Sequence, residues 1–181
     1  HFKGVELMNG VQRISVSGVY NGTSDDSLIV QANNLQLEEL RALTGEDLKG
    51  KVDGKVSIRQ LGENPLFEGS LKAAGLAFRQ YPVGDFEGTA IWNQGQKNLA
   101  IDGNLLREGS QLFHLYGFYT PDLPNPLDMR IKVQQLGIDF LQPLIGNSVS
   151  GMKGRAAGDL LVRGDFSRPE FSGNLYVIDP S

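Results

Sequence analysis

The chain has 181 residues, a formal net charge of −4 at pH 7 and no cysteine. Its basic residues are dispersed, which argues against a nucleic-acid-binding surface, and the absence of cysteine excludes disulfides and cysteine-ligated metal sites. No apolar run approaches the roughly 18 residues that a membrane-spanning helix needs.

Along most of the chain, apolar and polar residues alternate, which is typical of strands with one buried and one solvated face. The first clear examples are Ile14 and Val16, which alternate with serines, and later ones include Met129, Ile131 and Val133. Alternation begins within the opening residues, so we expect a piece of a larger protein. The pattern predicts about a dozen strands in an all-β, elongated, curved antiparallel sheet.

Two segments depart from this period. Leu37, Leu40 and Leu43 are spaced by three, and Ile138, Leu141 and Leu144 repeat the spacing. An acidic residue, Glu38 or Asp139, follows the first residue of each set. This spacing with an acidic first turn predicts one short helix in each segment. Polar, glycine-containing stretches at 93–95 and 107–109 predict hairpin turns.

The chain contains an internal repeat. Residues 48–72 align with 152–176 without gaps, 35–45 with 136–146, and 14–20 with 113–119. We therefore expect one elongated β-domain over 1–181, with a first unit at about 14–81, connecting strands at 82–112 and a second unit at about 113–181. The identical pairs in the longest block are Lys49/Lys153, Gly50/Gly154, Gly54/Gly158, Arg59/Arg163, Pro65/Pro169, Phe67/Phe171, Gly69/Gly173 and Leu71/Leu175.

The glycines of this repeat predict bends in a curved sheet, because glycine within strands marks bulges and close backbone approach. Gln60 stands where the second unit has Gly164. We therefore expect the bend after that strand to differ between the two units.

Candidate catalytic and metal-binding residues have simpler explanations. His114 is in phase with Ser15 on the polar face, and no Ser or Cys nucleophile motif accompanies it. Asp25 and Asp26 lack the alternating ligands of a calcium loop. We predict no catalytic residue, no metal site and no cofactor. The apolar stripe remains as the candidate functional feature, and its alternative interpretation is an ordinary core.

The order of short helix, paired glycines, alternating strand, proline and aromatic-x-glycine-x-leucine resembles the TamB family, within the AsmA-like group of bridge-like lipid transport proteins. The residues that carry this resemblance are "GIDFLQPLIG" (137–146), "KGRAAGDLLVRGDFSRPEFSGNL" (153–175) and their first-unit partners. It covers residues 14–81 and 113–181.

The resemblance implies a periplasmic segment of a protein anchored in the inner membrane of a Gram-negative bacterium. Its fold would be an open trough, the β-taco, that shelters phospholipid acyl chains and supports outer-membrane biogenesis without catalysis. The implied partners are phospholipid, a TamA-type outer-membrane barrel and unfolded outer-membrane proteins.

Parity within the strands selects the residues expected to line the groove. Among them, the equivalent Ile58 and Val162 should both point into the trough. The full set is Ile14, Val16, Val30, Val56, Ile58, Phe67, Leu71, Phe113, Leu115, Ile131, Val133, Val162, Phe171 and Leu175.

Two other functions fit parts of the pattern. A chaperone or scaffold for outer-membrane proteins could use the same trough or a sheet edge to receive client strands. A polysaccharide-active β-helix enzyme would need a row of acidic residues on stacked strands, and the sequence has no such row at the repeat spacing.

Overall fold

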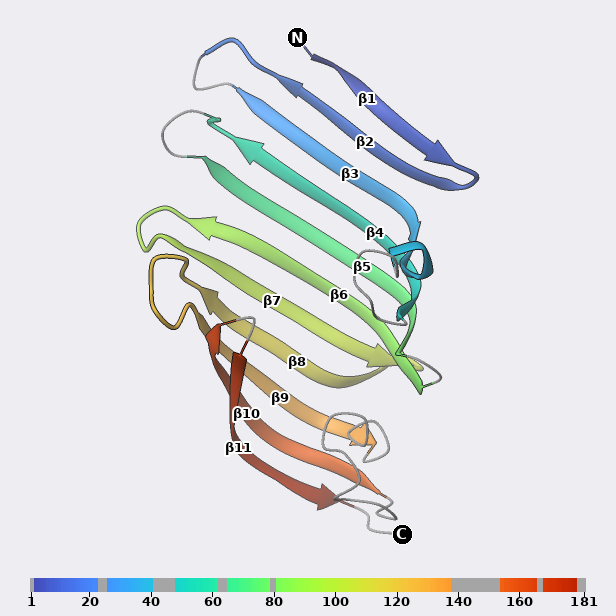
Figure 1. Ribbon diagram of the computed structural model, residues 1–181. Coiled ribbons are helices and arrows are strands. Elements are labelled where there is room, and N and C mark those ends of the chain that lie inside the picture. Colours follow the sequence, from blue (N-terminus) through green and yellow to red (C-terminus); the bar gives the residue numbers. More distant parts are fainter. Residues whose placement is uncertain are drawn as a thin grey trace.

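The computed structural model describes residues 2–22, 26–40, 48–61, 65–78, 81–137, 154–165 and 168–178. They form one open antiparallel sheet in which eleven strands follow one another in chain order (Figure 1). The strands are β1 (Phe2–Asn9), β2 (Gln12–Val19), β3 (Ser27–Gln36), β4 (Leu48–Arg59), β5 (Leu66–Phe78), β6 (Tyr81–Asn93), β7 (Asn98–Arg107), β8 (Ser110–Tyr119), β9 (Leu127–Gly137), β10 (Arg155–Asp165) and β11 (Arg168–Ile178). Within these ranges, no helix combines the length and apolar character needed to cross a membrane.

The all-β, curved antiparallel architecture confirms the predicted fold class. Every strand pairs with its neighbour in sequence in antiparallel orientation. A parallel β-helix is therefore wrong for this chain. The sheet bends towards its β11 end and so forms a trough (Figure 1).

Both predicted hairpin turns are present. Residues 94–97 connect β6 to β7, and Glu108 and Gly109 connect β7 to β8. Glu108 and Gly109 have positive φ values of 53° and 77°. Two consecutive positive φ angles define the two-residue type I′ turn, whose twist matches that of the flanking strands.

The predicted short helices are not seen in the described residues. In the first unit a single 3-10 turn, η1 (Leu37–Leu40), follows β3 directly, and residues 41–47 lie outside the described ranges. Strand β3 continues up to this turn, so the described part of the predicted helix consists of four residues in 3-10 conformation. The expected second helix, at 138–144, also lies outside the described ranges.

Strand register reproduces the sequence repeat pair by pair. In β4 and β5, Ile58 faces Phe67, and in β10 and β11 the equivalent Val162 faces Phe171. The same correspondence holds one and two strands earlier, where β2, β3 and β4 match β8, β9 and β10. The register therefore supports the alignment on which the repeat was predicted.

Backbone conformation repeats at some equivalent positions but not at Gly54/Gly158 or Gly69/Gly173, where only the second glycine has a positive φ. Gly50 and Gly154 have φ values of 134° and 127° at equivalent positions, in a region that favours glycine. Gln60 and Gly164 have φ values of 55° and 93°. Both residues take a positive φ, and glutamine adopts it in place of glycine. The two bends still differ, because Gln60 follows the last residue of β4, whereas Gly164 lies within β10 and faces Pro169.

One face of the sheet is apolar over its whole length. Two cross-strand rows illustrate it. The valine row consists of Val5, Val16, Val30, Val56, Gly69, Ala90, Ile101, Gly117, Met129, Val162 and Phe171, and the leucine row of Leu7, Ile14, Ala32, Gly54, Leu71, Gly88, Gly103, Leu115, Ile131, Leu160 and Gly173.

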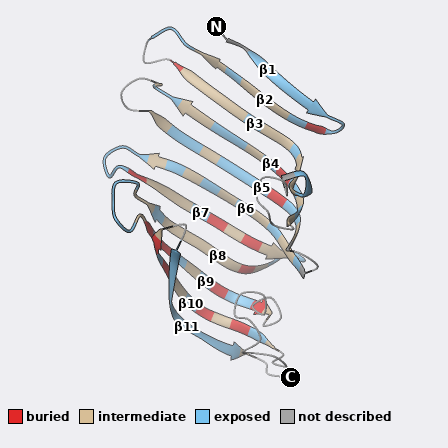
Figure 2. Cartoon of the chain, viewed as in Figure 1, coloured by how far each residue is buried: buried red, intermediate tan, exposed pale blue. Residues whose placement is uncertain are grey.

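Burial along this face is uneven. Most buried apolar side chains belong to β7–β10, here called the packed part (Figure 2). They form two clusters, one of Leu105, Leu112, Val133 and Leu136 and another of Leu127, Met129 and Val162. Over β3–β6, here called the open part, most side chains of the same face remain half-buried or exposed, and only Val52 and Ala73 are buried among the described residues.

Candidate functional site: an apolar hollow on the open part of the sheet

The open part carries a hollow of about 440 Å³ on its apolar face. Strands β3 to β7 contribute to it, and almost all of its surface comes from apolar atoms. Its volume falls within the range of small-molecule sites, roughly 300–1,000 Å³. The apolar side chains that line it are Val30, Ala32, Leu35, Val52, Val56, Leu71, Phe86, Ala90 and Ile101.

The hollow exists because glycines remove side chains from the middle of the face. Gly54, Gly69 and Gly88 lie on three adjacent strands and all border it. Larger neighbours on the same strands, such as Val56 and Leu71, form the walls and are 42% and 40% exposed. The arrangement leaves apolar surface uncovered where a closed sheet would be filled by side chains.

All fourteen predicted groove residues fall on this apolar face, because the bulges lie outside the strand segments from which parity selected them. The structure nevertheless divides them into three groups. Val30, Val56 and Leu71 line the hollow, with Ile14, Val16, Ile58 and Phe67 beside it on the same open side of the face; Phe113, Leu115, Ile131, Val133 and Val162 belong to or contact the packed clusters; Phe171 and Leu175 are exposed on the last strand.

Ile58 and Val162 share a face, as expected, but not an environment. Ile58 is half-buried, whereas Val162 is 9% exposed and packs in the cluster with Leu127 and Met129. The sheet bends at its C-terminal end, so β10, which carries Val162, lies in the packed part. A charge introduced at Val162 would therefore be buried.

Several residues of the hollow were absent from the sequence-based set. Phe86, Ala90 and Ile101 belong to the strands between the two repeat units, to which parity was not applied. Their alternation with polar residues was visible in the sequence. Leu112 was also missed, because a register irregularity between Leu105 and Leu106 shifts its phase and places it in the packed part.

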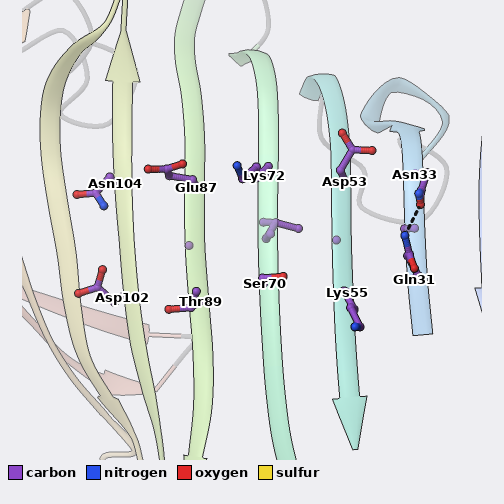
Figure 3. Close-up of a pocket in the computed structure, with 14 residues that line it drawn as sticks. Gln31, Asn33, Asp53, Lys55, Ser70, Lys72, Glu87, Thr89, Asp102 and Asn104 are labelled. Atoms are coloured by element: carbon purple, nitrogen blue, oxygen red, sulfur yellow. Dashed lines mark hydrogen bonds between the residues drawn. The ribbon is translucent and has the colours of Figure 1, made fainter. Parts of the chain in front are cut away.

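The opposite face carries charged and polar residues in ordered rows. A shallow polar hollow of about 380 Å³ lies there, and Figure 3 shows its side chains on adjacent strands. Asp53 faces Lys72, and Lys72 in turn faces Glu87. Opposite charges directly across strands stabilise a register. Such alternation of negative and positive charges is typical of a sheet face that is exposed to solvent.

His114 lies on this polar face, as its phase predicted. Its Nε2 lies 2.8 Å from the Asp102 carboxylate, and its ring stacks on Tyr116 with centroids 4.9 Å apart. Asp102 is exposed and takes part in the row of polar residues. Among the described residues, no group of three His, Asp or Glu side chains could hold a metal ion.

Asp26 stabilises the connection between β2 and β3. Its side chain is 2% exposed and accepts hydrogen bonds from the backbone amides of Asn21 at 2.5 Å and Gly22 at 2.9 Å. Its carbonyl accepts from the amide of Gln60 at 2.8 Å. Asp26 thus joins the β2–β3 connection to the end of β4. It lies in the turn that the sequence predicted, but it is buried and not solvated.

The apolar hollow therefore offers desolvation without polar recognition. Each methylene transferred from water into such a surface contributes about 0.8 kcal/mol, and an uncovered apolar surface of this kind on a protein commonly marks a binding site. No family model, no curated protein and no solved structure matches the chain.

Proposed function

We propose that the open part of the sheet binds phospholipid acyl chains and that the chain is one segment of a longer conduit. The observation that carries this proposal is the uncovered apolar hollow over β3–β6, continuous with an apolar face that crosses all eleven strands. Acyl chains are flexible and featureless, so a wall without polar groups holds them while permitting movement along it. No chemical step is part of this function.

The sequence resemblance to the TamB family extends the proposal. The chain would form a periplasmic part of a protein anchored in the inner membrane of a Gram-negative bacterium, supporting outer-membrane biogenesis together with a TamA-type barrel. The open trough is compatible with the β-taco of that family. Phospholipid would be the transported partner, and nucleic acid would not be one.

A site-specific photo-crosslinking experiment tests lipid binding. A photoreactive amino acid is placed at Val56 or Leu71, both on the hollow, and at Ser57 or Lys72, neither of which lines it, as matched controls. The controls are adjacent in sequence but point to the opposite face. Lipid adducts at the first pair and not at the second are expected, with native mass spectrometry and lipid extraction identifying the bound species.

Equal adducts at both pairs, or none at Val56 and Leu71 in lipid-containing envelopes, would contradict the proposal and favour an ordinary apolar core.

A chaperone or scaffold function is the second candidate. The observation that favours it is that β1 and β11 each pair with one described strand only, which leaves two sheet edges free. Unpaired edges can accept strands of client proteins by β-augmentation. Co-purification of unfolded outer-membrane proteins in place of lipid would support this function.

A further inference from the structure

No strand of the described residues pairs with the outer edge of β11. Among the described strands, β11 pairs with β10 alone. Its residues are exposed from Arg168 to Val177. An edge of this length presents a row of unpaired backbone groups that can template a further strand.

An equivalent edge elsewhere in the same sheet is paired with a strand. Strand β5 is the repeat equivalent of β11: Phe67, Gly69 and Leu71 face β4 in the register in which Phe171, Gly173 and Leu175 face β10. The other edge of β5 is occupied by β6. There Gly69 faces Ala90, Ser70 faces Thr89 and Leu71 faces Gly88.

At Phe171, side-chain exposure agrees with a missing neighbour. The ring of Phe67 packs edge-on against Trp92 of β6, with centroids 6.3 Å apart at 76°, and Phe67 is 36% exposed. Phe171, in the equivalent place, is 64% exposed. An aromatic side chain from an added strand would cover Phe171 as Trp92 covers Phe67.

We propose that the β11 edge binds an antiparallel strand of the β6 type by β-augmentation. The partner carries the apolar-face pattern Gly-x-Ala-x-aromatic that β6 has at Gly88, Ala90 and Trp92. Its register is fixed by the β5–β6 pairing: the residue equivalent to Thr89 faces Asn174, and the aromatic residue lies over Phe171. This inference does not depend on lipid binding.

The experiment uses a fluorescent synthetic peptide of residues 81–94 and the whole chain carrying Asn174→Cys. The natural chain has no cysteine, so the introduced thiol is unique. The peptide cysteine is supplied as a mixed disulfide with thiopyridine, so that the thiol at position 174 attacks it and releases pyridinethione. A peptide with Thr89→Cys should react with this thiol many times faster than a peptide with Ile91→Cys, because cross-strand pairing brings directly opposed Cβ atoms within about 5.5 Å.

A second chain variant, Ser70→Cys, is the matched control. Ser70 occupies the equivalent position, but the chain's own β6 already pairs there. No adduct is expected at this site. An adduct at Ser70→Cys equal to that at Asn174→Cys would show exchange of β6 and overturn the proposal, as would equal reaction of the two peptides.

Two N-methylated peptides test the pairing mode. Alternate amides of an added strand point towards the protein and towards solvent, so methylation of one alternate set should abolish binding and methylation of the other should leave it intact. Phe171→Ala should weaken binding about fivefold, from loss of one aromatic pair, whereas Phe67→Ala should leave it unchanged. Binding by both methylated peptides, or self-association of the chain through β11 in place of peptide binding, would overturn the proposal.

Discussion

Val56 and Val162 provide a direct test of the difference between the open and packed parts. Both lie in the valine row and point to the same face, yet Val56 is 42% exposed and Val162 is 9% exposed. The same substitution at the two sites therefore compares two environments while the residue type, strand geometry and face are held constant.

Substitution by alanine measures how much each valine side chain contributes to the free energy of unfolding. Two fully buried methyl groups contribute about 1.6 kcal/mol by transfer, and a cavity adds to this, so Val162→Ala should lower the free energy of unfolding by about 2 kcal/mol. Val56 is little more than half buried and borders space already empty. Val56→Ala should cost about 1 kcal/mol or less.

Substitution by glutamate should give a larger difference in stability loss between the two sites than substitution by alanine. At Val162 the carboxylate would be buried beside Leu127 and Met129 without a partner, which should cost about 3–5 kcal/mol. At Val56 the carboxylate reaches water through the hollow, so the loss should stay near 1 kcal/mol. Against a total stability of about 5–15 kcal/mol, the first change removes a large share.

Urea denaturation, with the slope of each transition compared to establish two-state unfolding, measures these differences. Equal losses for the two glutamate variants would refute the division of the sheet into open and packed parts. In the same samples, binding of an apolar dye should fall for Val56→Glu, since the charge enters the hollow itself.

Three other predictions concern separate features. Asp26→Ala should lower the free energy of unfolding by about 2–3 kcal/mol, because two backbone amides lose a charged acceptor; a loss below about 0.5 kcal/mol in urea denaturation would contradict this. Glu108→Asn should raise stability by about 0.5 kcal/mol, because asparagine tolerates the positive φ of a type I′ turn better than glutamate, and an unchanged or lower melting temperature would count against that turn. The unmodified chain should bind an apolar fluorescent dye more strongly than a closed β-sandwich of similar size, and equal fluorescence enhancement would indicate a sealed face.

The alternation of residues along each strand was sufficient to place the predicted residues on one face of the sheet. The period of a strand is two, so Ile14 and Val16 predict their own orientation and, through pairing, that of Val30 and Val56. Register irregularities could have inverted these sets, but they lie beyond the segments concerned. Leu112 shows the opposite case, because its phase changes at an irregularity that no residue pattern marks.

Burial could not be predicted in the same way. Leu71 and Leu175 are equivalent in sequence and similarly exposed, whereas Ile58 and Val162 are equivalent and differ. Curvature of the whole sheet decides which neighbours a side chain meets, and curvature is the sum of small twists over many strands. The hollow was missed in part for this reason, since it forms where three strands place glycines side by side.

The order of the strands has a consequence for how such a protein can change in length. The described strands lie in the sheet in the order in which they follow one another in the chain. Insertion or loss of one hairpin would therefore lengthen or shorten the trough by about 10 Å while every other pairing kept its partner. The length of such a sheet can therefore change in steps of one hairpin without a change of fold.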